Sequence, residues 1–108
     1  MSMFMIRIEL MYYPDADDYE TLHGNAERVG LLRTIRADNN VLYQLPPAEY
    51  YCEGSFTREQ VAEKAKWAAQ QTGKPYAVVI SEVVGVSWVG LDVAQPSKQR
   101  KSTFDSSR

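Results

Sequence analysis

The residues with the clearest chemistry are one histidine and the arginines that follow it. His23 is the only histidine of the chain, and imidazole is the one side chain that titrates near neutral pH without help from its surroundings. Metal-free cleavage of RNA needs a base for the 2′-hydroxyl, an acid for the leaving oxygen and a cation for the phosphorane charge. His23 suits the role of base. The alternative interpretation is that His23 is a structural residue, hydrogen-bonded or exposed, at the border of a helix face.

Three arginines follow His23 and suit the role of cation. Arg28 lies at the end of the same expected helix, and Arg33 and Arg36 lie on the next expected strand. Arg33 and Arg36 are three positions apart, and side chains alternate along a strand, so the two arginines lie on opposite faces. Arg28 and Arg33 are therefore candidates for catalysis beside His23, and Arg36 is a candidate for binding RNA. The alternative for all three is solvated surface charge.

Two more candidates for RNA contact lie on other expected strands. Arg7 faces away from the helices, where it either contacts a phosphate or pairs across the strands with a carboxylate such as Glu82. Tyr43 belongs to a group of tyrosines near strand ends, which can stack bases, form a dimer surface or simply suit strands. The other members of this group are Tyr12, Tyr13, Tyr50 and Tyr51.

Cysteine and histidine are too scarce for several kinds of site. Cys52 is the only cysteine, so an internal disulfide and a CxxC motif are excluded. A single histidine excludes a His-rich metal site, and we expect neither a metal nor a cofactor. Nothing near Cys52 lowers the pKa of its thiol, so we expect it to be unreactive. A lone thiol also fits a reducing cytoplasm.

The charge of the chain is unevenly distributed. Residues 1–92 carry eight Lys or Arg and thirteen Asp or Glu, a net charge of −5, and residues 93–108 carry four and one, a net charge of +3. An acidic domain lacks the field that drives tight, sequence-independent binding to nucleic acid, so RNA binding should be local and salt-dependent. The basic tail either helps to hold RNA or an acidic partner, or is a solvated terminus.

No segment of the chain resembles a membrane anchor or a signal peptide. No apolar run approaches the roughly 20 residues that a membrane span needs, and residues 1–10 lack a cationic start before an apolar run. We therefore expect a cytoplasmic protein without a membrane partner.

The apolar pattern predicts the elements that position these residues. Clean alternation predicts a strand with one buried face over residues 4–10, and a spacing of three and four predicts helices. The expected helices are 15–30 and 57–72, and the further strands are 31–37, 41–45 and 76–84. The strands 31–37 and 41–45 form a hairpin around Asp38-Asn39-Asn40.

Several details of these elements stay open. Asp15 and Asp17 are both suitable N-caps for the first helix, and Gly24 either weakens that helix or marks a close approach. Residues 48–53 resume the hairpin as an edge extension after Pro46-Pro47. Residues 86–91 continue the last strand or return beside it. Trp67 lies outside the apolar stripe of its helix and should be partly exposed.

The predicted order is β-α-β-β-α-β, the split βαβ arrangement of ferredoxin-like α+β folds. Such a domain has an antiparallel sheet with two helices on one face, and its other face is open to water or a partner. We expect this domain over residues 3–92 and a disordered basic tail over residues 93–108.

Several short segments form a recognisable set: Tyr19-Glu20-Thr21-Leu22-His23, Arg33-Thr34-Ile35, Tyr43-Gln44-Leu45-Pro46, Ala48-Glu49-Tyr50, Gln60-Val61, Thr72-Gly73-Lys74 and Trp88-Val89-Gly90-Leu91. With them, residues 4–91 resemble a family of small proteins of enterobacteria and their phages. That family is similar to GhoS-like antitoxins of type V toxin–antitoxin pairs.

The resemblance implies a homodimer with a ferredoxin-like fold and endoribonuclease activity on the messenger RNA of a membrane toxin. Similar nucleases carry an Asp at the end of the first strand, where this sequence has Glu9 and, further on, Asp15. The rival interpretation is a non-catalytic, dimeric module that binds a protein partner in a phage or prophage setting. The acidic core favours the rival, and a gathering of Arg7, Arg28 and Arg33 around His23 would favour the nuclease.

Overall fold

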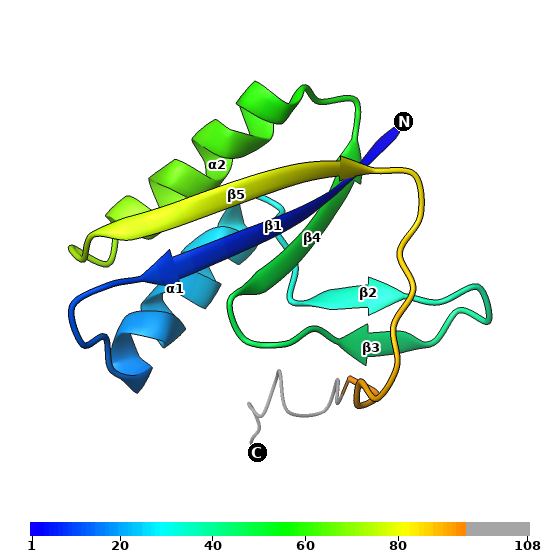
Figure 1. Ribbon diagram of the computed structural model, residues 1–108, viewed down its shortest axis with the longest axis horizontal. Helices are drawn as coiled ribbons and strands as arrows, with labels where there is room; N and C mark the ends of the chain where they lie inside the picture. The colour runs from blue at the N-terminus through cyan, green and yellow to red at the C-terminus, as the bar shows by residue number, and fades with distance from the viewer. Residues whose placement is uncertain (95–108) are drawn as a thin grey trace, which may run out of the picture.

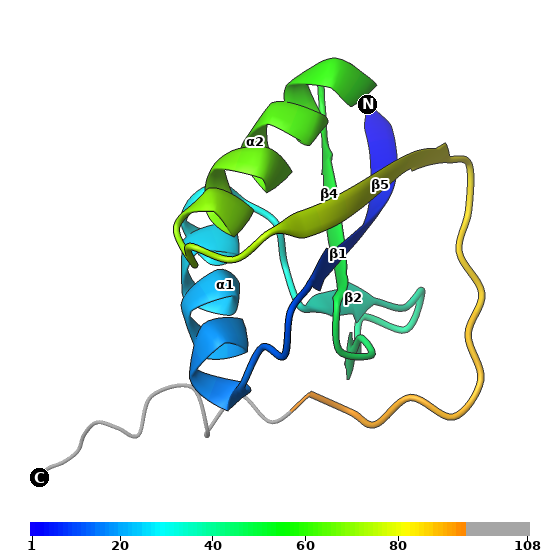
Figure 2. The ribbon, with the colours of Figure 1, turned by 60° about the vertical axis from the view of Figure 1, so that its left-hand side comes forward.

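A three-stranded antiparallel sheet forms the centre of the protein, whose computed structural model describes residues 1–94. β1 (Ser2–Leu10) lies between β4 (Glu49–Gly54) and β5 (Tyr76–Val83) and pairs antiparallel with both. The helices α1 (Ala16–Arg28) and α2 (Arg58–Gln70) cover one face of this sheet, as Figures 1 and 2 show. The other face carries no element of the described chain.

The hydrophobic core lies between the sheet and the two helices. The alternating residues of β1 that the sequence assigned to the core, from Phe4 to Leu10, are all buried, while Arg7 and Glu9 on the opposite face are exposed. α2 buries a stripe of Val61 and three alanines at 0% exposure. These small side chains let the helix lie close to the sheet. Trp67 lies outside the stripe and is 40% exposed, as predicted.

Both helices begin at a capping box. The Asp15 carboxylate accepts a hydrogen bond from the Asp18 amide at 2.9 Å, and the Asp18 carboxylate accepts one from the Asp15 amide at 3.0 Å. Asp15 is therefore the N-cap of α1, and the alternative of Asp17 is wrong. Thr57 and Gln60 cap α2 in the same way, as predicted. A Cβ atom added to Gly24 would have no neighbouring atom within 4 Å, so a close approach of another element does not explain the glycine at this position.

The predicted hairpin forms, but the strand that leads into it is divided. Leu32 exchanges two backbone hydrogen bonds with Tyr51 of β4, at 2.8 and 2.9 Å. The chain then leaves the main sheet, and β2 (Thr34–Arg36) pairs with β3 (Leu42–Gln44) as a separate two-stranded arm. Figure 1 shows this arm beside the main sheet.

Residues 48–53 do not extend the hairpin; that prediction is wrong. Pro46-Pro47 ends β3, since proline cannot donate to a ladder, and Ala48 takes a positive φ of 73° that turns the chain. The residues that follow form β4, which pairs with β1 from Ser2↔Gly54 to Arg7↔Glu49. The observed order is thus β-α-β-β-β-α-β. The α+β fold with two helices on one face of an antiparallel sheet is the ferredoxin-like arrangement that the sequence predicts.

Residues 84–91, which we call the strap, run from the end of β5 past the hairpin (Figure 1, yellow to orange). The predicted strand over residues 86–91 is absent from this part of the described chain. Beyond the strap, the Gln44 amide donates to Asp92 and the Ala94 amide donates to Leu42. Val93 and Ala94 therefore belong to the fold, and the rest of the expected tail lies outside the described residues.

None of the helices within residues 1–94 is long and apolar enough to cross a membrane.

Candidate functional site

His23 lies on α1 above the sheet and is hydrogen-bonded to a buried tyrosine. Its Nδ1 lies 2.7 Å from the hydroxyl oxygen of Tyr50, a residue of β4 with 0% exposure. The two rings are 5.8 Å apart, and Tyr19 lies 6.2 Å from His23 on its own helix. Nε2 of His23 makes no hydrogen bond within the described part of the chain. One ring nitrogen is thus fixed by the fold while the other stays open to a ligand.

Arg33 lies beside the same tyrosine, at the point where the chain leaves the main sheet. Its guanidinium carbon is 6.0 Å from the Tyr50 ring centroid, a cation–π distance. Nη2 donates a long hydrogen bond of 3.4 Å to the Leu45 carbonyl, and Nε is buried with no partner among the described residues. Nη1 also makes no hydrogen bond among the described residues. A guanidinium with unused donors binds a phosphate well.

His23 and Arg33 line one cleft, which we call the His23 cleft. It has a volume of about 390 Å³ and lies between the C-terminal half of α1 and the β2–β3 hairpin. Gln44 of β3 also lines it, and its amide is held by the Arg33 carbonyl at 2.9 Å. Glu27 adds one carboxylate to the lining. The cleft therefore brings an imidazole, a guanidinium and an amide together.

The surroundings of His23 keep its imidazole neutral. Burial lowers the pKa of His23, and the nearby positive charge of Arg33 lowers it further, to about 4. Burial also raises the pKa of the Tyr50 hydroxyl well above its usual value, although Arg33 acts in the opposite direction. Near pH 7 both groups of the hydrogen bond are thus uncharged. In the tautomer in which Nδ1–H donates to Tyr50, the free Nε2 carries a lone pair and can accept a proton.

The other candidate residues lie away from the His23 cleft. Arg28 is exposed in the last turn of α1 and does not line the cleft. Arg36 donates to the carbonyl and the side chain of Asn40, at 3.0 and 3.2 Å, across the hairpin turn. Of the three arginines considered for a patch around His23, the structure brings only Arg33 to it.

Arg7 lies on the open face of the sheet and is paired with carboxylates. It donates to Glu9 at 2.7 Å and to Glu49 at 3.1 Å. Cross-strand pairing was one of its two interpretations, but Glu82 is not the partner. Glu82 lies opposite Phe4, on the helix-covered side of the sheet.

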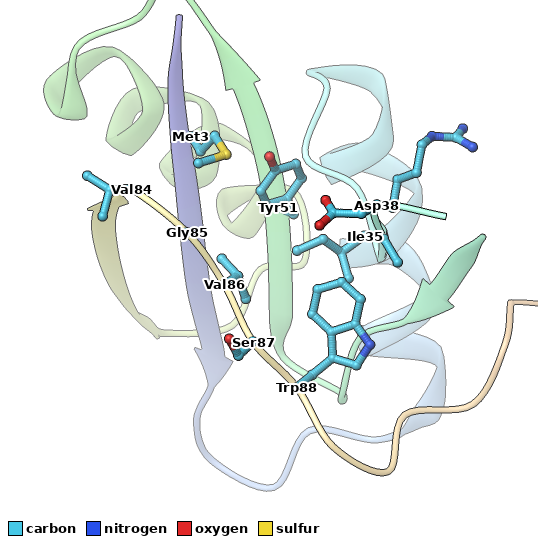
Figure 3. A pocket seen from close by; sticks show the side chains of 11 residues that line it. Met3, Ile35, Asp38, Tyr51, Val84, Gly85, Val86, Ser87 and Trp88 are labelled. Atoms are coloured by element: carbon cyan, nitrogen blue, oxygen red, sulfur yellow. The ribbon is translucent and has the colours of Figure 1, made fainter. Parts of the chain in front are cut away.

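Tyr43 contacts the strap, which covers a second hollow. Its ring lies 5.5 Å from that of Trp88. Trp88, Ile35 and Tyr51 line a cavity of about 620 Å³ between the strap, the hairpin and the open sheet face, as Figure 3 shows. This cavity lacks the histidine and the unpartnered guanidinium nitrogen of the His23 cleft, so we do not place the chemistry there.

Cys52 and the acidic side chains do not add a further site. Cys52 is buried, and burial raises the pKa of its thiol, which is the environment expected of an unreactive thiol. Within residues 1–94 no three His, Cys, Asp or Glu side chains gather closely enough to hold a metal ion.

Two residues around His23 and Arg33 were not predicted as part of this site: Tyr50, which is buried behind the cleft, and Gln44, which lines it. Tyr50 was grouped with the stacking tyrosines, although its alternation with Ala48 and Cys52 is the signal of a buried strand face. Gln44 reaches the cleft because β3 pairs Gln44 with Thr34. That register depends on where the chain leaves the main sheet, which the sequence pattern does not reveal.

No family model matches this chain, and no curated protein sequence matches it either.

Proposed function

We propose that this protein is a GhoS-like endoribonuclease that cleaves single-stranded RNA in the His23 cleft. One observation carries the proposal. Nδ1 of His23 is hydrogen-bonded to the buried hydroxyl of Tyr50, and the Arg33 guanidinium beside that tyrosine has donors without a hydrogen-bond partner. A base whose orientation is fixed and a cation within the same cleft are two of the three groups that metal-free RNA cleavage needs. The family resemblance over residues 4–91 supports the same activity.

In the proposed reaction Nε2 of His23 accepts the proton of an RNA 2′-hydroxyl. The 2′-oxygen attacks the adjacent phosphorus, the bond from phosphorus to the 5′-oxygen breaks, and the leaving oxygen takes a proton from water. The hydroxide that remains takes the proton from His23, which restores the base. The products are a 2′,3′-cyclic phosphate and a 5′-hydroxyl. Arg33 stabilises the extra negative charge of the phosphorane, since guanidinium donors match phosphate oxygens.

Tyr50 is a positioning residue in this scheme. When Nδ1–H donates to the Tyr50 hydroxyl, Nε2 carries the lone pair that accepts the proton. The low pKa of His23 keeps Nε2 unprotonated near pH 7. A phosphate bound beside it raises that pKa, because an opposite charge favours the imidazolium. The histidine is therefore free to accept a proton before RNA binds and a better base afterwards.

We further propose the setting that the resemblance implies. The protein acts in the cytoplasm as an antitoxin, as a homodimer, on the messenger RNA of a membrane toxin. The acidic charge of residues 1–92 makes RNA binding weak and local, so added salt weakens it further.

The test is incubation of a long single-stranded RNA with the pure protein, in Mg²⁺ and in EDTA. We expect cleavage in both, a large loss in His23→Ala and in Arg33→Lys, and little change in Arg28→Ala, because Arg28 lies outside the cleft. The Arg33→Lys variant keeps the charge and removes the planar fork. Absence of cleavage, or full activity of His23→Ala, overturns the proposal.

A second candidate function is a non-catalytic module that binds a protein partner. The observation that favours it is the exposed apolar character of the strap, where Val84 and Val89 are 102% and 97% exposed. Intact RNA together with a stable complex with another protein would support this candidate.

A further inference from the structure

The strap is a strand-like segment without a strand partner. None of its residues, from Val84 to Leu91, makes a hydrogen bond within the described chain, through backbone or side chain. Its one specific contact is the ring of Trp88 against Tyr43. Valine and tryptophan are favoured in strands, which is why the sequence predicted one here. Eight residues of suitable composition therefore present unpaired backbone groups.

β5 has an unpaired edge directly before the strap. It pairs with β1 on one side, from Met3↔Val83 to Leu10↔Tyr76, and no described element pairs with its other side. The opposite edge of the sheet is different, because Leu32 covers β4 through its two hydrogen bonds with Tyr51. The free edge of β5 and the strap thus follow one another along the chain, with eight residues each.

The composition of this stretch lacks the usual protection of an exposed edge. Natural edges carry charges, proline or bulges that prevent pairing with another chain. Residues 76–91 contain one charged residue, Glu82, and no proline. Val79, Val84 and Val89 are 59%, 102% and 97% exposed. Two such stretches can approach with little charge repulsion and with apolar surface to bury.

We infer that residues 76–91 are the surface through which two copies of this chain associate, the strap of each copy pairing with the free edge of β5 in the other. A two-fold axis between the copies makes the pairing reciprocal. The strap of each copy then pairs with β5 of the other, so both copies gain the same hydrogen bonds. Because the two segments have equal length, every backbone group that faces the partner in either segment can find a hydrogen-bond partner. The pairing is main-chain addition to a sheet edge, the mode called β-augmentation.

This inference rests on the homodimer within the proposed function but not on RNA cleavage. Figures 1 and 3 show the strap on the side of the sheet away from α1 and α2. Since His23 lies on α1, the pairing leaves the His23 cleft open. The absence of a dimer and the absence of RNA cleavage can therefore be observed independently of each other.

The first experiment measures the oligomeric state of the full chain by sedimentation equilibrium, without RNA. We compare Val86→Pro and Ser87→Pro with Val86→Ala and Ser87→Ala. Neither amide is hydrogen-bonded in the single chain, so the prolines should leave the monomer folded, as thermal unfolding will verify. In a ladder, alternate amides face the partner, so one of the two prolines removes a pairing donor in each copy.

We expect a wild-type dimer and a dissociation constant at least about tenfold higher for one of the prolines. The alanine variants should stay close to wild type. A monomeric wild type, or a dimer that neither proline weakens, overturns the inference. The latter result places the association on another surface.

Hydrogen exchange gives a second, mutation-free readout. The outward amides of β5 and alternate amides of the strap should exchange more slowly as protein concentration rises, while exposed amides of the hairpin turn, such as Asp38, should not change. Exchange in residues 76–91 that is independent of concentration, in a sample shown to be dimeric, contradicts the proposed surface.

Discussion

At the scale of single residues, the defining feature is His23, because protonation of its imidazole lowers the stability of the folded protein. The pKa of His23 is lowered to about 4, first by burial and then by Arg33, whereas an unfolded histidine titrates near 6.5. Between these values the unfolded chain binds more protons than the native protein, so stability falls as the pH falls through this window.

A comparison with His23→Gln isolates this effect. The carboxylates that also titrate below pH 6 are common to both proteins, so they cancel in the difference. We expect the free energy of unfolding of wild type, relative to the variant, to fall by about 1 kcal/mol from pH 7 to pH 4. This figure is discounted for the half-exposed ring. Urea titrations at several pH values measure it, and a difference that is constant with pH contradicts the assigned environment.

The Tyr50 hydroxyl is the second residue-scale feature. Tyr50→Phe keeps the buried ring and removes the partner of Nδ1, so we expect a loss of about 1–2 kcal/mol in unfolding free energy. Tyr51→Phe is the matched control, because the Tyr51 hydroxyl bonds Glu53 at an exposed site, and its loss should be a few tenths of a kcal/mol. Nitrogen chemical shifts of the imidazole should change in Tyr50→Phe alone. Equal effects of the two variants would argue against a special role for Tyr50.

At the scale of elements, the start of α1 offers a direct comparison of two neighbouring aspartates. The Asp15 carboxylate accepts one hydrogen bond of the capping box and the Asp15 amide donates the other, whereas Asp17 only lies in the first turn. Asp15→Ala should lower the free energy of unfolding by about 1 kcal/mol, and Asp17→Ala by a few tenths. Chemical denaturation distinguishes them, and the reverse order would show that the cap is elsewhere.

Two glycines make a similar pair. Gly54 ends β4 with a φ of +155°, and a Cβ built there lies 2.6 Å from Cε2 of Phe56, while Gly24 sits in α1 with open space around it. Gly54→Ala should destabilise the protein by about 1–3 kcal/mol. Gly24→Ala should stabilise it by up to about 1 kcal/mol. Thermal unfolding measures both, and a neutral Gly54→Ala would contradict the strained turn.

The helices and the central strand were predictable because their signals are local. A capping box, a stripe of small residues and strict alternation are read within a few residues of each other. The division of residues 31–37 was not predictable, because it depends on Leu32 meeting Tyr51 from β4. The position of Arg33 follows from that division and was not predictable, whereas His23 on α1 and Gln44 on β3 could be placed on their elements beforehand.

At the scale of the whole molecule, the two faces of the sheet carry different groups. The open face pairs its arginine with Glu9 and Glu49, which leaves little positive charge there for RNA. The His23 cleft lies on the helix side, and the strap lies at the opposite side of the hairpin. The acidic charge of residues 1–92 predicts weak nucleic-acid binding, and this stays a prediction. The charge total does not indicate which cation of the fold lacks a carboxylate partner.

The central claim is that His23 and Arg33 cleave RNA through the 2′-hydroxyl. The most direct measurement is analysis of the product ends after incubation of a labelled single-stranded RNA in EDTA, beside the same strand with one 2′-deoxy substitution at the main cleavage position. We predict a 2′,3′-cyclic phosphate and a 5′-hydroxyl from the RNA, and no cleavage at the substituted position. Intact RNA, or cleavage that continues at the 2′-deoxy position, would contradict the account.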